Sequence, residues 1–369
     1  MPYKISGSLS ESTRIIIINN YDWSIESNTV VSESSFLIDS MTSGTKTVIG
    51  LDNNYKVIGY GNIDPIYYSD ARGMFAGGSV GGPTSSNTID YVSISTIGDA
   101  ADFGDMTQAK RSLAATSNGS NDRGIFGGGS TGSDINNIDY ITMSNAGNAT
   151  DFGDITLARR NLAATSNGVN NKGVFGGGYS GSSYVNNMDY ITISTMGDAN
   201  DFGDLLVTLG WLSATSNGAN DRGIFGGGNY APSTYSNVIN YITISTNSDA
   251  TDFGDMISPR YALTSTSNGI NDRGVFAGGY TTGSVAVNII DYITISTTGN
   301  ATDFGDMVSA IYSLASTSNG TGNRGIFGGG YISTYINIID YITISTIGDA
   351  QDFGDLTIAR NYLSATSNA

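Results

Sequence analysis

The stretch RGIFGGG, from Arg123 to Gly129, occurs in recognisable form six times along this chain. Successive copies are 51, 49, 50, 51 and 51 residues apart, measured between their phenylalanines. Those phenylalanines are Phe75, Phe126, Phe175, Phe225, Phe276 and Phe327. Regular self-similarity of this kind indicates a tandem repeat with a period of about 50 residues. Each repeat is therefore expected to fold into the same small unit.

Each repeat holds four short segments of β-forming composition, with sequences close to LAATSN, RGIFGGG, IDYITIS and DFGD. The glycines after each Phe suit strand ends where backbones approach closely. Copies of the other three segments are marked by Leu113, Leu162, Leu212, Leu263, Leu314 and Leu363, by Tyr91, Tyr140, Tyr190, Tyr241, Tyr292 and Tyr341, and by Asp102, Asp151, Asp201, Asp252, Asp303 and Asp352. The pattern predicts an all-β fold, a β-propeller with one four-stranded blade per period.

The phase of the repeats predicts how the array ends. It opens on the second segment, ARGMFAGG, and finishes on an isolated first segment, LSATSNA. Residues Leu363 to Asn368 are therefore expected to complete the blade whose other strands come from about Arg72 to Asp105. This arrangement removes an open sheet edge. We expect six blades over residues 65–369, closed by the C-terminal strand.

Composition excludes several classes of function. The 369 residues include no Cys and no His, which removes disulfides, thiol nucleophiles, Cys/His zinc sites and His-based acid or base catalysis. A net charge of −17 repels nucleic acid and anionic lipid. The longest aliphatic run, Ile15 to Ile18, is too short to span a membrane, and the N-terminal residues have no leader pattern. A soluble, unprocessed protein is expected, with no nucleic-acid partner and no membrane insertion.

Residues 1–64 lie outside the repeat. Short β-rich runs such as TRIIIINNYDW and YKVIGYGNI, separated by Ser, Asn, Asp and Gly, predict a small antiparallel β-sandwich. The order of ISG, NNYDW and YKVIGYGN resembles the carboxypeptidase-regulatory or transthyretin-like modules of tailed-phage virion proteins. That resemblance implies a docking or spacing role for this domain.

The repeats resemble the kelch family over about 300 residues, in the Gly run, the later Tyr and a cation before the first strand. Four repeats have this cation, as Lys110, Arg159, Arg260 or Arg360, whereas the other two have Leu209 and Ile311 at its position. The Trp of the family is replaced by the Phe of DFGD. An ion pair made by the cation is therefore not expected in every repeat. The sequence pattern YITIST.GDATDFGD most resembles propeller repeats of tailed-phage structural proteins. That resemblance implies a virion location, virion partners and an oligomeric state set by virion symmetry.

Every repeat also carries a triplet of the form D/N-x-x-D-F-G-D, the first being Asp99, Asp102 and Asp105. Clustered carboxylates of this kind are candidate Ca²⁺ ligands. The alternative is that the Asp and Asn side chains cap turns by accepting backbone N–H bonds. We favour the capping role, and expect no other cofactor.

A second repeated charge precedes each Gly-rich strand, at Arg72, Arg123, Lys172, Arg222, Arg273 and Arg324. Six cations at equivalent positions form a ring, which could bind an anion on the axis. The expectation that we favour is a surface pair between each cation and an Asp of a DFGD turn, which adds little stability.

The repeats differ most in two connections, between the second and third strands and between the fourth and first strands. In an up-and-down blade both emerge on one face, and their Tyr-, Ser- and Gly-rich composition is typical of adaptable binding surfaces. Free drift of exposed loops is the alternative. The candidate contacts are Tyr179, Tyr184, Trp211, Tyr230, Tyr235, Tyr261, Tyr280, Tyr312, Tyr331, Tyr335 and Tyr362.

These observations predict a non-enzymatic virion protein whose propeller presents its variable face to a host-surface glycan or protein receptor, or to another virion component. One alternative is a purely architectural decoration or fibre subunit. A second is a glycan-degrading enzyme that uses carboxylates alone, for which the sequence offers no specific motif. No catalytic residue is assigned.

Overall fold

The computed structural model describes residues 4–6, 17–19, 22–24, 35–38, 46–51, 57–64 and 71–369, without 232, 233 and 284. The chain divides into two units, Met1–Asp70 and Ala71–Ala369, so the boundary lies a few residues beyond the predicted 64/65. Within the described residues, no helix has the length and apolarity needed to cross a membrane.

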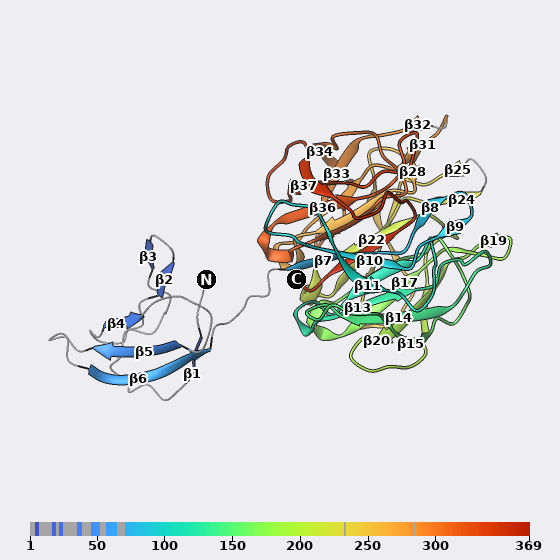
Figure 1. Ribbon diagram of the computed structural model, residues 1–369. Coiled ribbons are helices and arrows are strands. Elements are labelled where there is room, and N and C mark those ends of the chain that lie inside the picture. The colour runs from blue at the N-terminus through green and yellow to red at the C-terminus, as the bar shows by residue number, and fades with distance from the viewer. Residues whose placement is uncertain are drawn as a thin grey trace. The chain divides into compact units, whose positions relative to one another are not determined.

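In the first unit the described strands form two antiparallel sheets, one of four strands in the order β1-β6-β5-β4 and one hairpin, β2-β3 (Figure 1). These strands are β1 (Lys4–Ser6), β2 (Ile17–Asn19), β3 (Asp22–Ser24), β4 (Ser35–Ile38), β5 (Lys46–Leu51) and β6 (Val57–Asp64). The remaining residues of the predicted sandwich lie outside the described ones.

The second unit contains six four-stranded antiparallel sheets, which we number 1 to 6. Sheet 1 is β39-β7-β10-β11, sheet 2 β12-β13-β14-β15, sheet 3 β16-β17-β20-β21, sheet 4 β22-β23-β26-β27, sheet 5 β29-β30-β33-β34 and sheet 6 β35-β36-β37-β38. The architecture is all-β and β-propeller-like, and each sheet takes its strands from the four predicted segments in the predicted order.

The first strands, from LAATSN, are β12 (Ala114–Ser117), β16 (Ala163–Ser166), β22 (Ser213–Ser216), β29 (Thr264–Ser267), β35 (Ala315–Ser318) and β39 (Ser364–Ser367). The second strands, from RGIFGGG, are β7 (Arg72–Ala76), β13 (Arg123–Gly127), β17 (Lys172–Gly176), β23 (Arg222–Gly226), β30 (Arg273–Ala277) and β36 (Arg324–Gly328).

The third strands are β10 (Thr88–Ser93), β14 (Asn137–Thr142), β20 (Asn187–Thr192), β26 (Val238–Thr243), β33 (Ile289–Thr294) and β37 (Ile338–Thr343). The fourth are β11 (Ala101–Asp105), β15 (Thr150–Asp154), β21 (Asn200–Asp204), β27 (Thr251–Asp255), β34 (Thr302–Asp306) and β38 (Gln351–Asp355). Five 3-10 turns join first to second strands: η1 (Gly119–Asn121), η2 (Gly168–Asn170), η3 (Gly218–Asn220), η4 (Gly269–Asn271) and η5 (Gly320–Gly322).

Phe and Gly of the second strands pack one sheet against the next. Phe175 of sheet 3 is fully buried, and a Cβ built on Gly127 of sheet 2 would lie 2.6 Å from its ring. The same contact recurs between Gly226 and Phe276, at 2.7 Å. A Cβ at Gly127 or Gly226 would force the ring to shift, because real Cβ atoms do not approach so closely, and Ala76 and Ala277 show that sheets 1 and 5 accommodate one at the same position. RGIFGGG is thus a packing element between sheets.

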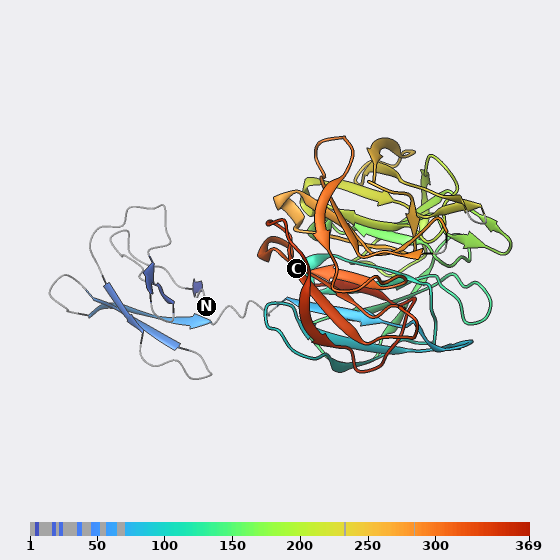
Figure 2. The ribbon, with the colours of Figure 1, turned by 90° about the horizontal axis from the view of Figure 1, so that it is seen from above.

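The two ends of the repeat array meet in one sheet. The C-terminal strand β39 pairs antiparallel with β7, with Ala365 opposite Phe75. In Figure 2 the red C-terminal strands lie beside the blue strands of sheet 1. The first strands also neighbour one another in a cycle, from β12 through β16, β22, β29 and β35 to β39 and back to β12. They therefore surround the axis of the unit.

The turns that carry the D/N-x-x-D-F-G-D triplets link each sheet to the next. The Oδ1 atom of Asn148 accepts a hydrogen bond from the backbone N–H of Asp105 at 3.0 Å, and Asp99 accepts one from Asp355 at 3.1 Å. The other four repeats make the same bond. The first residue of each triplet thus caps a backbone group of the neighbouring sheet.

The repeated cations before the second strands do not pair with Asp as expected. The guanidinium of Arg123 lies 4.5 Å from the ring centroid of Tyr140, and it donates to the carbonyl oxygen of Ile193 in the next sheet at 3.0 Å. All six cations stack on the Tyr of the third strand, at 4.3–5.0 Å. The ion-pair expectation was therefore wrong, because the Tyr face takes the place of the carboxylate.

Candidate functional site

The two variable connections lie side by side in the second unit. Backbone bridges join them at each sheet, for example Arg160 with Tyr179 and Tyr312 with Tyr331. At sheet 5 the two connections form a small three-stranded sheet of β28 (Arg260–Tyr261), β31 (Tyr280–Thr281) and β32 (Val285–Ala286) in place of a single bridge. Short hairpins form in the same place on sheets 1, 3 and 4: β8 (Ser79–Gly81) with β9 (Thr84–Ser85), β18 (Tyr179–Ser180) with β19 (Ser183–Tyr184), and β24 (Asn229–Ala231) with β25 (Thr234–Tyr235).

A ring of six backbone hydrogen bonds sits where these connections reach the axis. The N–H of Trp211 donates to the carbonyl of Asn161 at 2.8 Å, and the bonds continue residue by residue until the N–H of Ser112 donates to Tyr362. All six ring residues adopt a left-handed backbone, with φ between 53° and 57°. They are Ser112, Asn161, Trp211, Ala262, Ser313 and Tyr362. For side chains other than Gly and Asn this conformation is strained, and such strain is concentrated at functional sites.

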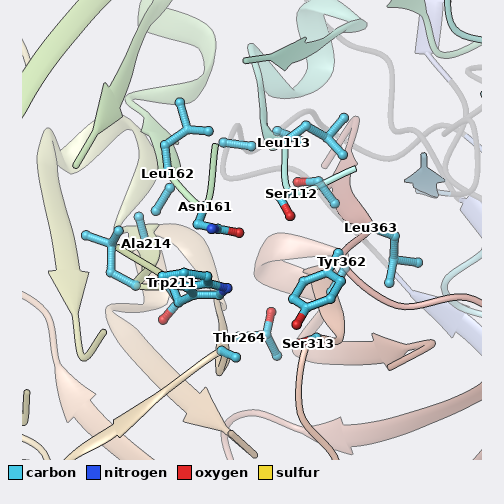
Figure 3. A pocket seen from close by; sticks show the side chains of 18 of the residues that line it. Ser112, Leu113, Asn161, Leu162, Trp211, Ala214, Thr264, Ser313, Tyr362 and Leu363 are labelled. Atoms are coloured by element: carbon cyan, nitrogen blue, oxygen red, sulfur yellow. The ribbon is translucent and has the colours of Figure 1, made fainter. Parts of the chain in front are cut away.

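An axial pocket of about 120 Å³ opens inside this ring. Four layers of six residues line it: the ring residues, the six leucines before the first strands, and two layers of Ala, Ser and Thr from those strands. Figure 3 shows Trp211 and Tyr362 on opposite sides, with Asn161, Ser112 and Ser313 between them. The mouth is therefore aromatic and polar, and the layers beneath it are narrow and small.

Three buried hydroxyls of the pocket wall have no hydrogen-bond partner among the described residues. They belong to Ser213, Ser265 and Ser313, whose exposed fractions are 6%, 8% and 5%. A buried hydroxyl without a partner costs free energy, so water or a ligand group is expected to bond to it. The pocket is thus suited to a small group rich in hydroxyls.

Nine of the predicted contact residues form one chain of touching rings, which we call the aromatic arc. The rings follow each other from sheet 3 to sheet 6, with centroids 4.7–6.2 Å apart. The aromatic arc consists of Tyr184, Tyr179, Trp211, Tyr261, Tyr235, Tyr280, Tyr312, Tyr331 and Tyr335. Trp211 belongs both to this arc and to the pocket mouth.

The other two predicted contacts lie elsewhere. Tyr362 lines the pocket opposite Trp211, whereas Tyr230 on β24 is 46% exposed and has no ring contact among the described residues. Burial and the neighbouring phenols Tyr235 and Tyr362 raise the pKa of Tyr261. Burial likewise raises the pKa of Tyr312. These side chains therefore remain neutral and present uncharged rings and hydroxyls.

The rim over sheets 1 and 2 is polar, and this polar part extends to Arg160 in the connection that enters sheet 3. Arg111 donates to the carbonyl of Gly82 at 3.2 Å, and Arg160 pairs with Asp134 while stacking on Tyr179 at 4.7 Å. At the matching positions of sheets 5 and 6 stand Tyr261 and Tyr312. The variable face thus has an aromatic half and a polar half.

The carboxylates do not gather into a centre for chemistry. The residues that line the axial pocket include no Asp or Glu. Among the described residues no group of three acidic side chains is placed to hold a metal ion. Asp99, a calcium candidate with Asp102 and Asp105, instead bonds to the backbone of Asp355.

Sequence reasoning missed Ser112, Asn161, Ala262 and Ser313 at the pocket mouth. Their position directly precedes the repeated Leu of the first strand and holds a different kind of residue in most repeats. That contrast was the available signal. The signal is weak, because four of the six residues at this position are small or polar and resemble ordinary loop residues.

No protein-family model matches this chain, and no curated protein matches it. Solved structures do match, among them the one titled "Structure of YjhT", with a TM-score of 0.57 and 9% sequence identity. The similarity covers 71% of this chain and 88% of that chain. At such low identity the likeness concerns the fold alone, and it supports the β-propeller-like architecture.

Proposed function

We propose that this protein is a non-enzymatic glycan-binding protein and that its second unit is a six-bladed propeller closed by the C-terminal strand. The pairing of β39 with β7 and the ring of backbone bonds through Ser112 and Tyr362 support the closed ring. One observation carries the binding role. The aromatic arc and the axial pocket occupy the same face, and Trp211 belongs to both.

Glycan chemistry fits this surface well. A sugar ring has apolar C–H faces that stack on aromatic rings and a rim of hydroxyls that bonds to small polar groups. The arc offers Tyr and Trp, which give contact area at low entropy cost. The pocket offers the unpartnered hydroxyls of Ser213, Ser265 and Ser313 and the amide of Asn161. A chain of sugars would lie along the arc and place one unit at the mouth.

The resemblance of the repeats to tailed-phage structural proteins supports a location on the virion. We propose that the ligand is a host-surface polysaccharide, and that the first unit docks or spaces the propeller on other virion proteins. The absence of carboxylates from the pocket lining supports binding without hydrolysis.

Binding to purified bacterial surface polysaccharide, measured by calorimetry or on a glycan array, tests the proposal. The double variant Trp211→Ala/Tyr261→Ala should weaken binding at least about a hundredfold, because it removes two adjacent rings at the centre of the arc. Tyr230→Ala is the matched control. Its ring lies on the same face but outside the arc, and it should leave binding within about twofold.

Three results would count against this function. Equal loss in the double variant and in Tyr230→Ala would show that the arc is not the contact. Binding to virion parts alone, unaffected by either change, would favour the architectural role. Release of new reducing ends from the polysaccharide would favour an enzyme.

A further inference from the structure

Buried ion pairs hold the variable connections onto four of the six sheets. In sheet 1, Arg360 lies 2.9 Å from Asp90 and also donates to the carbonyl oxygens of Phe75 and Thr88 at 3.0 Å. Both charged side chains are fully buried. The equivalent pairs are Lys110–Asp139, Arg159–Asp189 and Arg260–Asp291, at 2.7–3.1 Å. Each cation thus ties the connection before a first strand to the second and third strands.

Sheet 4 has lost both members of this pair. Leu209 stands at the position of the cation and Asn240 at the position of the Asp, and both are fully buried. The exchange is electrically neutral, since no charge is left in the interior. Sheet 4 therefore shows that this fold tolerates the site without the pair.

Sheet 6 has lost only the cation. Ile311 replaces it, but Asp340 remains, 1% exposed, and no side chain among the described residues donates to either of its carboxylate oxygens. A second support, which three of the other four carboxylates have, is missing as well. Thr107, Thr156 and Thr357 donate to the Asp of sheets 2, 3 and 1, whereas Val308 holds that position here.

The surroundings of Asp340 offer no compensating charge. Asp352 lies opposite on β38 and adds a second negative charge, while Phe327 lies opposite on β36. Burial raises the pKa of Asp340 to about 6, and the negative charge of Asp352 adds to this rise. The backbone N–H of Val308 acts in the opposite direction. The carboxyl group thus changes its charge in mildly acidic conditions.

Part of the aromatic arc belongs to the connection before the first strand of sheet 6, which contains Ile311. Tyr312 follows Ile311 in the chain, and its backbone bridges to Tyr331 through bonds of 2.9 and 3.3 Å. Their rings touch, with centroids 5.5 Å apart. In sheet 6 these contacts hold the connection without the ion pair that anchors its counterparts.

We propose that Asp340 is a pH-sensitive element that controls the sheet 6 end of the aromatic arc. When the carboxyl group is protonated, the connection through Ile311 stays closed and Tyr312 is held in the arc. When it ionises, the buried charge favours an opening of that connection that admits water. The opening follows from Asp340 alone, whereas its effect on ligand rests on the proposed function.

Hydrogen exchange of the full chain at pH 5 and pH 7.5, corrected for the intrinsic rates, tests the opening without any ligand. Residues 306–313 and 328–335 should exchange on the order of tenfold faster at the higher pH, because such exchange reports local opening. Asp340→Asn should abolish that difference, and Asn240 shows that an amide is accepted at this position. The reciprocal variant Asn240→Asp should create a new pH dependence in residues 205–212.

Equal exchange at both pH values in the wild type, or an unchanged pH dependence in Asp340→Asn, would overturn the proposal. Polysaccharide binding then separates the two ideas. If exchange behaves as expected and binding is tighter at pH 5 only with Asp340 present, both stand. If exchange behaves as expected but no polysaccharide binds at either pH, the proposed function fails and the pH-sensitive opening remains.

Discussion

Replacing Arg360 by leucine is expected to destabilise the second unit by about 3–5 kcal/mol. The guanidinium makes three bonds of 2.9–3.0 Å, to Asp90, Phe75 and Thr88, and it is fully buried. Burial lowers the pKa of Arg360 against the attraction of Asp90, but arginine remains charged in proteins. The variant therefore strands a buried carboxylate, whose remaining donors belong to Thr357. Most of the loss comes from that stranded charge.

Arg360→Leu/Asp90→Asn provides the decisive comparison, because it copies the Leu209 and Asn240 of sheet 4. Removing both charges removes the stranded carboxylate, and a buried pair replaced by neutral side chains is often close to neutral in stability. The double variant should lie within about 1–2 kcal/mol of the wild type. Arg360→Leu alone is therefore expected to be less stable than the double variant.

Denaturant unfolding and calorimetry measure these differences. For a unit of about 300 residues the unfolding entropy near the midpoint is about 0.6 kcal/mol per degree, so a loss of 4 kcal/mol lowers Tm by about 6 °C. A loss below about 1 kcal/mol in Arg360→Leu would refute the reasoning. So would a double variant less stable than Arg360→Leu.

Three further changes test other parts of the fold. Deleting residues 364–369 should lower Tm in a calorimetric scan by at least about 5 °C, since it exposes the edge of β7, and an unchanged melt would contradict the closure. Asp340→Asn should raise stability by about 1–3 kcal/mol in urea unfolding at pH 8 and by nothing near pH 3. The folded pKa of about 6 exceeds the ordinary 3.8, so the wild type loses stability as pH rises through that interval. Gly226→Val should cost about 1–3 kcal/mol in the same assay, because its side chain would overlap the ring of Phe276, whereas Gly226→Ala should cost less than about 1 kcal/mol, since Ala277 holds this position in sheet 5; equal results for the two would argue against that packing.

The strands could be predicted because the same four β-forming segments recur in every repeat. RGIFGGG becomes a second strand in every sheet, and its glycines leave the space that the neighbouring Phe fills. The partner of the repeated cation could not be predicted in this way. Arg123 and Ile125 share one side of β13, and Tyr140 lies opposite Ile125, so the ring reaches the guanidinium diagonally across the strands. That contact depends on register, which composition does not contain.

The candidate site was predicted in outline and missed in detail. Aromatic residues in unlike loops identified the arc, because Trp211 differs from all its counterparts and the positions of Tyr179 and Tyr261 are Tyr in only some of the repeats. The axial pocket was not predicted, because its wall comes from LAATSN, where only the second and third residues differ between repeats. Ser213 and Ser265 stand at these two variable positions and bring hydroxyls into the pocket.

Sheets 4, 5 and 6, which carry seven of the nine arc residues, differ from sheets 1, 2 and 3 in how the connection before the first strand is anchored. In the connections that enter sheets 1, 2 and 3, a Thr bonds to the buried Asp, whereas Leu206, Ile257 and Val308 hold this position in sheets 4, 5 and 6 and are 49%, 50% and 58% exposed. Two of those three sheets also lack the buried cation. Exposed aliphatic side chains in place of bonded Thr give no stability to the fold, since they leave apolar surface in water. If the proposed glycan also covers Leu206, Ile257 and Val308, it would bury them together with the rings of the arc. On that proposal, substitutions over sheets 1 and 2 should affect glycan binding least.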